Sequence, residues 1–368
     1  MIIQSIELNN FRNYENLQIS FDEGTNILFG DNAQGKTNIL EAAYLSGTTK
    51  SHKGSKDKEM IRFGTNEAHL RTMVLKKGKQ YQIDMHLKHN RSKGIAVNKI
   101  PMKKASELFG ILNIVFFSPE DLNIIKNGPS ERRHFLDAEL CQLDKIYLSD
   151  LSNYNKILNQ RNKLLKDMVY RPELSDTLPV WDMQLADTGK KIIRRREQFV
   201  KELNEIVHEI HYRISGGREE LFLSYEPSVS ADLLEQELER VKPRDLKQCQ
   251  TSVGPHRDDL LFSIAGVDIR KFGSQGQQRT SALSLKLSEI ELVRKSIHDT
   301  PVLLLDDVLS ELDSNRQNYL LNSICDTQTI ITCTGLDEFI RNRFEINKVF
   351  EVISGQVFEK GQVIERQG

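Results

Sequence analysis

Hydrophobic and polar positions alternate over much of the first third of the chain, which predicts β-strands joined by polar turns. The predicted strands cover residues 2–8, 17–21, 26–29, 67–100 (as a meander) and 113–117. One helix is expected among them, from about Lys36 to Leu45, with its apolar residues on one side. The N-terminal part is therefore expected to be mainly sheet.

Between residues 130 and 216 the apolar residues repeat every seven positions, which predicts helices with an a/d seam. Arg161 and Asp150 interrupt the first seam, and a polar segment with Pro172 and Pro179 separates it from the second. The pattern predicts either an antiparallel hairpin with arms of roughly 50 Å or two helices of an ordinary bundle. The seam positions are Leu136, Leu140, Leu143, Tyr147, Tyr154, Ile157, Leu164, Met168, Leu185, Ile192, Phe199, Leu203, Ile206 and Ile210.

Beyond Gly217 the pattern returns to strands and helices in mixed order. Strands are expected at 221–226, 260–272, 300–306 and 328–334, with a helix at about 275–295. The fold class is therefore α/β, with a mixed sheet in a domain of residues 1–118 and 296–368. A mainly helical domain of residues 119–295, containing the short hairpin, interrupts it.

Composition narrows the classes of function. Lys plus Arg is 51 and Asp plus Glu is 52, so the net charge of -1 excludes a polycation, and any nucleic acid would have to bind a local patch. The four cysteines form no C-x-x-C pair, which argues against a zinc ribbon. With no apolar run of about 20 residues and no signal-peptide pattern, we expect a cytoplasmic protein without membrane contact.

The strongest chemical signal is a G-x-x-x-x-G-K-T motif placed after a strand and at a helix start. Such a loop wraps backbone N–H groups around phosphates, its lysine reaches the β- and γ-oxygens, and its threonine binds Mg²⁺. The motif predicts ATP and Mg²⁺ as cofactors, with Lys36 also counted as catalytic and Thr37 as a metal ligand. Its residues are Gly30, Asp31, Asn32, Ala33, Gln34, Gly35, Lys36 and Thr37.

Two further motifs complete the candidate site. Asp306 and Asp307 follow an apolar strand, expected beside the strand of the phosphate loop; Asp306 would hold the metal and Asp307 would orient or deprotonate the attacking water. Ser274 would cap the helix that follows it, and the N–H groups at that helix start offer a second anion site near Gly276 and Gln277.

In this order, the motifs resemble those of ABC-type ATPases, and finer details resemble the branch that contains the SMC proteins and, more specifically, the RecF family. These details are Ile6–Leu8, Asn10–Tyr14, Asn32, Ser51–Asp57, Phe117–Asp121, Gly254–Asp259 and Ser274–Arg279, while Ser310–Asp313 belongs to the general ABC-type resemblance. The resemblance extends from residue 2 to about 334.

The resemblance implies an ATP-dependent DNA-binding protein of recombinational repair. It implies an ATP-driven homodimer in which Ser274 of one subunit reaches the γ-phosphate held by the other. It also implies action at single-stranded or gapped DNA with RecR- and RecO-like partners, in recombinase loading, replication restart and SOS induction. By the same resemblance Arg12 would approach the nucleotide phosphates, a simple salt bridge being the alternative.

Departures from the wider ABC pattern predict slow hydrolysis. Asp307 stands where most ABC transporters have glutamate, so a water would be held at longer reach. Glu120 is the nearest candidate for the missing loop glutamine, and Thr332 or Thr334 lies near the place of the missing switch histidine. The alternatives are an SMC-like chromosome-organising ATPase, which would need coiled coils of hundreds of residues, and a transporter subunit.

Three weaker patterns have competing interpretations. His256 with Asp258 and Asp259 suggests a structural turn rather than metal ligands. The run of basic residues at 190–196 suggests a solvated helix face rather than a phosphate grip. The basic residues of two turns would form a DNA backbone patch if both turns pointed to the same side. Those residues are Lys76, Lys77, Lys79, Arg91 and Lys93.

Overall fold

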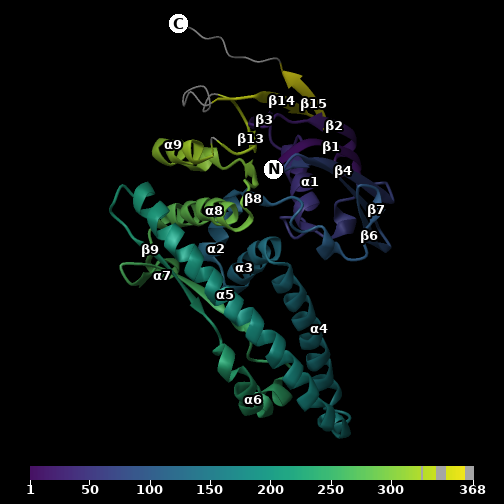
Figure 1. Ribbon diagram of the computed structural model, residues 1–368, viewed down its shortest axis with the longest axis vertical. Helices are drawn as coiled ribbons and strands as arrows, with labels where there is room; N and C mark the ends of the chain where they lie inside the picture. The colour runs from purple at the N-terminus through teal and green to yellow at the C-terminus, as the bar shows by residue number, and fades with distance from the viewer. Residues whose placement is uncertain (325, 337–344, 361–368) are drawn as a thin grey trace. The chain divides into compact units, whose positions relative to one another are not determined.

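The computed structural model describes residues 1–324, 326–336 and 345–360, and the chain divides into two compact units (Figure 1). The head unit comprises Met1–Asp121 and Glu289–Gly368, and the helical unit comprises Leu122–Ser288. The chain leaves the head unit after Asp121 and re-enters it at Glu289, so the head unit is formed by both the N-terminal and the C-terminal parts of the sequence.

An antiparallel six-stranded sheet forms one layer of the head unit, in the order β2-β1-β4-β5-β6-β7. Its strands alternate buried and exposed positions, as one-sided sheets do. The bounds are β1 (Ile2–Phe11), β2 (Tyr14–Ser20), β4 (Glu67–Lys76), β5 (Lys79–Lys88), β6 (Arg91–Val97) and β7 (Ile100–Pro101).

The second head sheet has the order β15-β14-β3-β13-β12-β8, and only β15 pairs antiparallel. Its strands β3, β12 and β13 are almost wholly buried, as parallel strands covered on both faces are. The bounds are β3 (Thr25–Phe29), β8 (Ile114–Phe117), β12 (Val302–Asp306), β13 (Thr329–Cys333), β14 (Lys348–Ile353) and β15 (Gln356–Lys360).

The strand order corrects one expectation about the site. β12, which ends at Asp306, is not the neighbour of β3, because β13 lies between them and pairs with both. All three strands run parallel, so their carboxyl ends meet at one edge of the sheet. The phosphate loop after β3 and the carboxylates after β12 therefore still lie on the same side.

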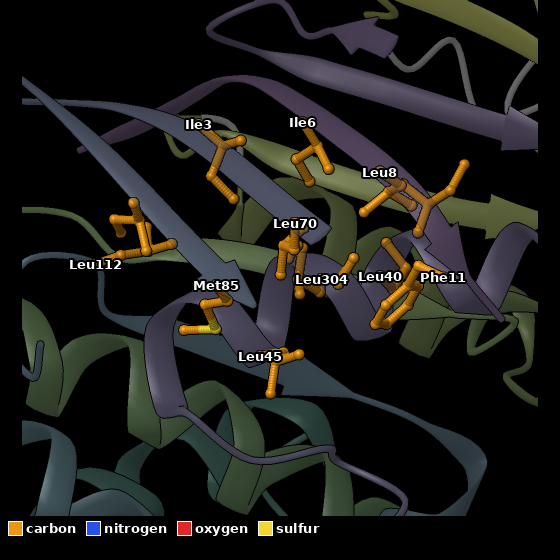
Figure 2. Packing of buried hydrophobic residues seen from close by; sticks show 14 of the residues in the cluster. Ile3, Ile6, Leu8, Phe11, Leu40, Leu45, Leu70, Met85, Leu112 and Leu304 are labelled. Atoms are coloured by element: carbon orange, nitrogen blue, oxygen red, sulfur yellow. The ribbon is translucent and has the colours of Figure 1, made fainter. Parts of the chain in front are cut away.

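Helix α1 (Lys36–Thr48) forms the core of the head unit, since it contacts strands of both sheets. Ile39, Leu40, Ala42, Ala43 and Leu45 are all fully buried, so the helix is covered on every side. Figure 2 shows Leu40 and Leu45 of α1 gathered with side chains of β1, β4 and β12. The packing of α1 holds the loop at its N-terminus against both layers. A further head helix, α9 (Ser314–Ser323), follows β12.

Two long helices dominate the helical unit. α4 (Lys145–Asp167) and α5 (Leu178–Ile214) lie side by side and run antiparallel, because Arg161 bonds to Asp182 near their connection while Tyr147 bonds to Arg196 further along (Figure 1). The first seam begins on a separate helix, because Asp144 ends α3 (Pro129–Leu143) and caps α4. Arg161 does not interrupt the seam, since its side chain is fully buried.

The rest of the helical unit surrounds these helices. A three-stranded sheet of order β11-β10-β9 packs against α5 through β9. The segment Ile269–Phe272, expected to continue a strand, is the short helix α7, capped by Asp268. The remaining bounds are α2 (Leu122–Lys126), β9 (Leu221–Glu226), α6 (Leu234–Gln248), β10 (Asp259–Ile264) and β11 (Val267–Asp268). Helix α8 (Gln275–Ile297) begins in the helical unit, and its last residues, from Glu289, belong to the head unit. Among the described residues, no helix is long and apolar enough to cross a membrane.

Candidate nucleotide-binding site

The phosphate loop needs its glycines for both backbone angle and space. Gly30 and Gly35 have φ of 148° and 116°, and Ala33 also has a positive φ of 64°. A Cβ on Gly30 would lie 2.4 Å from the carbonyl oxygen of Val352, and one on Gly35 would lie 2.5 Å from the side-chain nitrogen Nδ2 of Asn13. A larger residue at Gly30 or Gly35 would therefore disrupt the backbone conformation of the loop.

The loop leads straight into α1, which begins at Lys36. Gly35 is the N-cap, and no side-chain hydrogen bond caps the helix there. The exposed residues Asp31, Asn32 and Ala33 form the outer part of the loop. Because the first N–H groups of a helix point along its axis and carry partial positive charge, this end of α1 is suited to a phosphate anion.

Residues at two hairpin turns stabilise the phosphate loop through hydrogen bonds. Asn13 donates to the carbonyl of Gln34 at 3.0 Å, and the Tyr14 hydroxyl donates to the carbonyl of Gly35 at 3.1 Å. From the β14–β15 turn, the Ser354 N–H donates to the Gln34 side chain at 2.5 Å. The sequence motifs include Asn13 and Tyr14 without indicating a role for them, and Ser354 belongs to no motif and gives no sequence signal.

Lys36 lies inside the curve of the loop. Its ammonium group donates to the carbonyl oxygens of Gly30 at 2.7 Å and Asp31 at 2.9 Å. The residue is only 4% exposed. An ammonium group has three protons, so these two bonds orient it and leave the third donor for a phosphate oxygen.

Thr37, Asp306 and Thr332 form one hydrogen-bonded cluster at the carboxyl ends of the strands. The Thr37 hydroxyl donates to Asp306 Oδ1 at 2.8 Å, and the Thr332 hydroxyl donates to the same oxygen at 2.7 Å. Of the two threonines considered near the switch position, it is Thr332 that contacts Asp306. The cluster joins α1, β12 and β13 through one carboxylate oxygen.

Asp307 has a different environment from Asp306, although the two are adjacent. Its φ is 52°, and its backbone N–H donates to the Thr332 hydroxyl at 3.0 Å. Burial raises the pKa of the Asp307 carboxyl, the nearby Lys36 ammonium opposes that effect, and the Asp306 carboxylate adds to it. A carboxylate whose pKa is raised is a stronger base, which is what proton abstraction from water requires.

Arg12 makes the salt bridge that was the alternative to a phosphate contact. Its guanidinium binds both carboxylate oxygens of the buried Glu41 at 2.6 Å and also donates to Ser55 at 2.7 Å. The Ser51 hydroxyl donates to Glu41 as well. Burial opposes ionisation of Glu41, but the Arg12 and Ser51 hydrogen bonds outweigh it, so the pKa of Glu41 is lowered. Contact between Arg12 and a nucleotide stays a prediction.

In the helical unit, the predicted cap of α8 is confirmed. The Gln277 N–H donates to the Ser274 hydroxyl at 3.2 Å, and the Ser274 N–H donates back to the Gln277 side chain at 2.9 Å, which is a capping box. Ser274 and Gly276 are exposed, and the neighbouring Phe272 is 74% exposed. This helix start is therefore accessible from solvent within the chain itself.

Two of the weaker patterns can now be interpreted. His256 hydrogen-bonds to the Tyr154 hydroxyl at 2.7 Å and to the carbonyl of Thr251 at 3.1 Å, which supports the structural turn. The solvated-face interpretation of residues 190–196 is wrong for Arg196, whose side chain is 2% exposed and donates to Asp137 at 2.7 Å. Its burial is compensated by several acceptors, as a buried charge requires.

The proposed basic patch on the head unit is not formed. Lys76–Lys79 and Lys88–Arg91 connect the two opposite ends of β5, so the turns lie about 30 Å apart by the rise of a ten-residue strand. Lys93 is also engaged, donating to Asp57 at 2.7 Å. Successive hairpin turns of a meander alternate between the two ends of its strands, so these two turns do not point to the same side.

The parallel strands, the phosphate loop and the Asp306–Asp307 pair define an ABC-type ATPase head, with a separate unit that carries the Ser274 motif. The same fold is found in the Smc head domain from Pyrococcus furiosus, which is 18% identical and covers 97% of this chain and 96% of its own, with a TM-score of 0.57. The longest described helix has 37 residues, so the described part of the chain contains no SMC-type coiled coil of hundreds of residues.

Closer relatives identify the family. The RecF/RecN/SMC N-terminal domain family matches residues 2–356. The DNA replication and repair protein RecF of Agathobacter rectalis is 74% identical over 357 residues, which cover 97% of this chain and 99% of that protein. A structure of the recombination mediator protein RecF with ATP, in the RecFOR pathway, is 38% identical, covers 98% and 97% of the two chains, and has a TM-score of 0.91. The chain belongs to the RecF family of DNA replication and repair proteins.

Proposed function

We propose that the chain is an ATP-dependent DNA-binding protein of recombinational repair. The bound nucleotide would control both its dimerisation and its affinity for DNA. The observation that carries the proposal is the contact between Thr37 and Asp306, at 2.8 Å beside the ammonium group of Lys36. It unites the end of the phosphate loop with the carboxylate strand, as a metal–triphosphate site requires. We further propose that the head and helical units are the ATPase domain and the domain carrying the signature motif.

Mg²⁺ fits the donors present. The Thr37 hydroxyl and Asp306 Oδ1 are both oxygen ligands, which Mg²⁺ prefers, and they lie within hydrogen-bonding distance of each other. Thr332 orients the carboxylate from the other side. When bound, the ion would neutralise charge on the β- and γ-phosphates, while Lys36 and the first N–H groups of α1 hold the same phosphates.

Hydrolysis would depend on Asp307. Its carboxyl lies near Lys36 and has a raised pKa, which suits a group that orients water and accepts its proton. The side chain is one methylene shorter than glutamate, so the water would be held at longer reach and turnover would be slow. The ATPase therefore suits a switch that resets after each DNA-binding event.

The dimer would be completed by Ser274. As the family resemblance implies, the exposed capping box of Ser274, with Gly276 and Gln277, would close over the γ-phosphate held by a second copy. The high exposure of Phe272 beside it supports an interface at this helix start, since a large exposed apolar side chain gains from being covered. ATP would then lie between two subunits and link their association to nucleotide state.

The proposed ligand is single-stranded or gapped DNA, and the proposed partners are RecO- and RecR-like proteins. A relative with the same fold is described as a recombination mediator in the RecFOR pathway, which supports both proposals. The test is binding of a gapped duplex with ATP and Mg²⁺, measured by fluorescence anisotropy. Wild type and the exposed control Lys103→Ala should bind more tightly with ATP than with ADP. Lys36→Ala should lose nucleotide binding and with it the ATP-dependent gain. A gain that survives in Lys36→Ala would contradict the proposal.

A further inference from the structure

A second group of chemically reactive side chains lies on the antiparallel sheet of the head unit, apart from the phosphate loop. Glu67 and His69 are two residues apart on β4, so they point to the same face of the sheet. His86 on β5 is paired directly opposite His69. The register of the two strands therefore brings two imidazoles and one carboxylate together.

The donor atoms of the three side chains converge. His86 Nε2 lies 2.9 Å from one oxygen of Glu67, and His69 Nε2 lies 3.7 Å from the other. The two rings stack with their centroids 3.9 Å apart. One ligand atom from each residue falls within 4.8 Å of both of the others. Atoms this close together are near enough to share one cation once the side chains adjust to it.

These atoms match the ligand set of a zinc site. Zn²⁺ bonds to histidine nitrogen and carboxylate oxygen at about 2.0–2.2 Å, so adjacent ligands of a tetrahedral ion lie about 3.4 Å apart. The distances from His86 and His69 to the two oxygens of Glu67 lie on either side of that value. Stacked imidazoles repel each other when both are protonated, whereas neutral rings and an ionised carboxylate can all donate lone pairs to one cation.

The surrounding surface leaves room for the ion. Gly94 is paired opposite His86 on its other side, and a Cβ added there would meet only the His86 Cβ, at 3.9 Å. His69, His86 and Gly94 lie along a groove of about 740 Å³ on this face. Lys88 competes for Glu67 at 3.5 Å, and its partly exposed, flexible side chain can turn to solvent.

We propose that Glu67, His69 and His86 bind one Zn²⁺ ion with a fourth position open to the groove. Three protein ligands with an open position are the arrangement of zinc sites that also take water or an external ligand. The ion would cross-link β4 and β5, adding to the backbone pairing and to the Glu67 contacts with His86 and Lys88 that join the two strands here. The proposal is independent of the nucleotide site and of the DNA function.

The test uses the full-length chain without a histidine tag, stripped with chelator and kept in excess Mg²⁺ to occupy the nucleotide site. Titration with Zn²⁺ should show one site, and His69→Ala should weaken it on the order of tenfold or more. His89→Ala, an exposed histidine just beyond β5, is the matched control and should bind like wild type. Lys88→Gln should bind Zn²⁺ at least as tightly, because the competing cation is gone.

Two further readouts separate the site from adventitious binding. Zn²⁺ should raise the unfolding temperature of wild type and of His89→Ala, and should leave that of His69→Ala unchanged. Cys249→Ser should keep full binding, since no thiol belongs to the site. The proposal is overturned if wild type binds no more Zn²⁺ than His69→Ala, or if Cys249→Ser abolishes the binding.

Discussion

At the scale of single residues, Asp306 and Asp307 show how neighbouring carboxylates acquire different properties. Asp306 Oδ1 accepts hydrogen bonds from Thr37 and Thr332, which direct it toward the start of α1. Asp307 turns away through a positive φ and has a raised pKa because burial disfavours its charge. These environments support the proposal that Asp306 is a metal ligand and Asp307 the base.

Replacing Asp307 by asparagine should separate these roles. Asp307→Asn keeps the size of the side chain but cannot accept a proton, so ATP hydrolysis should fall by about 10²–10⁴-fold while ATP binding persists. Phosphate release measures the first and equilibrium binding of a fluorescent ATP analogue the second. Asp187→Asn, which alters an exposed carboxylate of α5 outside every motif, serves as the control. Unchanged hydrolysis in Asp307→Asn would exclude Asp307 as the base.

The buried His52 should make the folding stability of the protein sensitive to acid. Burial lowers its pKa to about 4, the nearby Glu41 opposes that effect, and its ring stacks on Phe116 with centroids 4.2 Å apart. An unfolded chain takes up the proton near pH 6.5. The stability from neutral His52 is therefore present above pH 6.5 and is lost as the pH falls toward 4.

The comparison is between wild type and His52→Phe, which keeps the aromatic stack but cannot be protonated. Between pH 7 and pH 4.5, wild type should lose about 2–3 kcal/mol more free energy of unfolding than His52→Phe. Urea unfolding at the two pH values measures this, with the exposed His89→Phe as control. Equal acid sensitivity of wild type and His52→Phe would show that His52 is not the group responsible.

Sequence motifs identify the residues of the candidate site, but they do not show which partners those residues contact. Lys36, Thr37 and Asp306 could be identified because the motif specifies both the residue types and the preceding strand. The Arg12 salt bridge to Glu41 could not be chosen over a phosphate contact, because Glu41 lies 29 positions away on α1 and has no motif of its own. Tertiary proximity of this kind has no local signal.

At the scale of elements, a buried ion cluster holds the long helices together. Arg161 of α4 binds Asp182 of α5 at 2.5 Å and Asp245 of α6 at 2.7 Å, and it also donates to Thr251. The Arg161 and Asp245 side chains are fully buried. Removing the arginine would leave two carboxylates without their counter-charge.

Arg161→Ala should therefore lower the stability of the helical unit by about 3–5 kcal/mol. Arg194→Ala removes an exposed arginine of α5 that pairs with Asp232, and should cost less than about 1 kcal/mol. Urea unfolding followed through Trp181 reports on this unit, since it is the only tryptophan of the chain and precedes Asp182. Similar losses in the two variants would refute the role given to the cluster.

The same cluster shows where periodicity fails to predict packing. The seven-residue repeat located α4 and α5, but it treated Arg161 as a break although that position is as fully buried as Leu140 of the same register. A buried arginine becomes acceptable only when partners from α5 and α6 meet it, and those partners are distant in sequence. Likewise, β13 could not be placed between β3 and β12, because strand order depends on crossovers and not on strand pattern.

At the scale of the whole molecule, the proposal requires two copies to act together. Ser274 should contribute to association as well as to the cap of α8. Ser274→Asn preserves the cap, since asparagine caps helices as well as serine does, but removes the hydroxyl. We expect it to bind ATP normally and to fail to dimerise with ATP, as Ser274→Ala should. Normal ATP-driven dimerisation of both variants would contradict a role for the hydroxyl in the dimer.

The central claim is that ATP brings two subunits together and so controls the grip on DNA. Light scattering of the 42.3 kDa chain with ATP, with ADP and without nucleotide, each with and without a gapped duplex, tests it most directly. The account predicts a monomer mass without nucleotide and with ADP, a dimer mass with ATP, and stronger dimerisation when the gapped duplex is present. A mass that does not change with ATP, or a dimer of equal strength under all conditions, would contradict it.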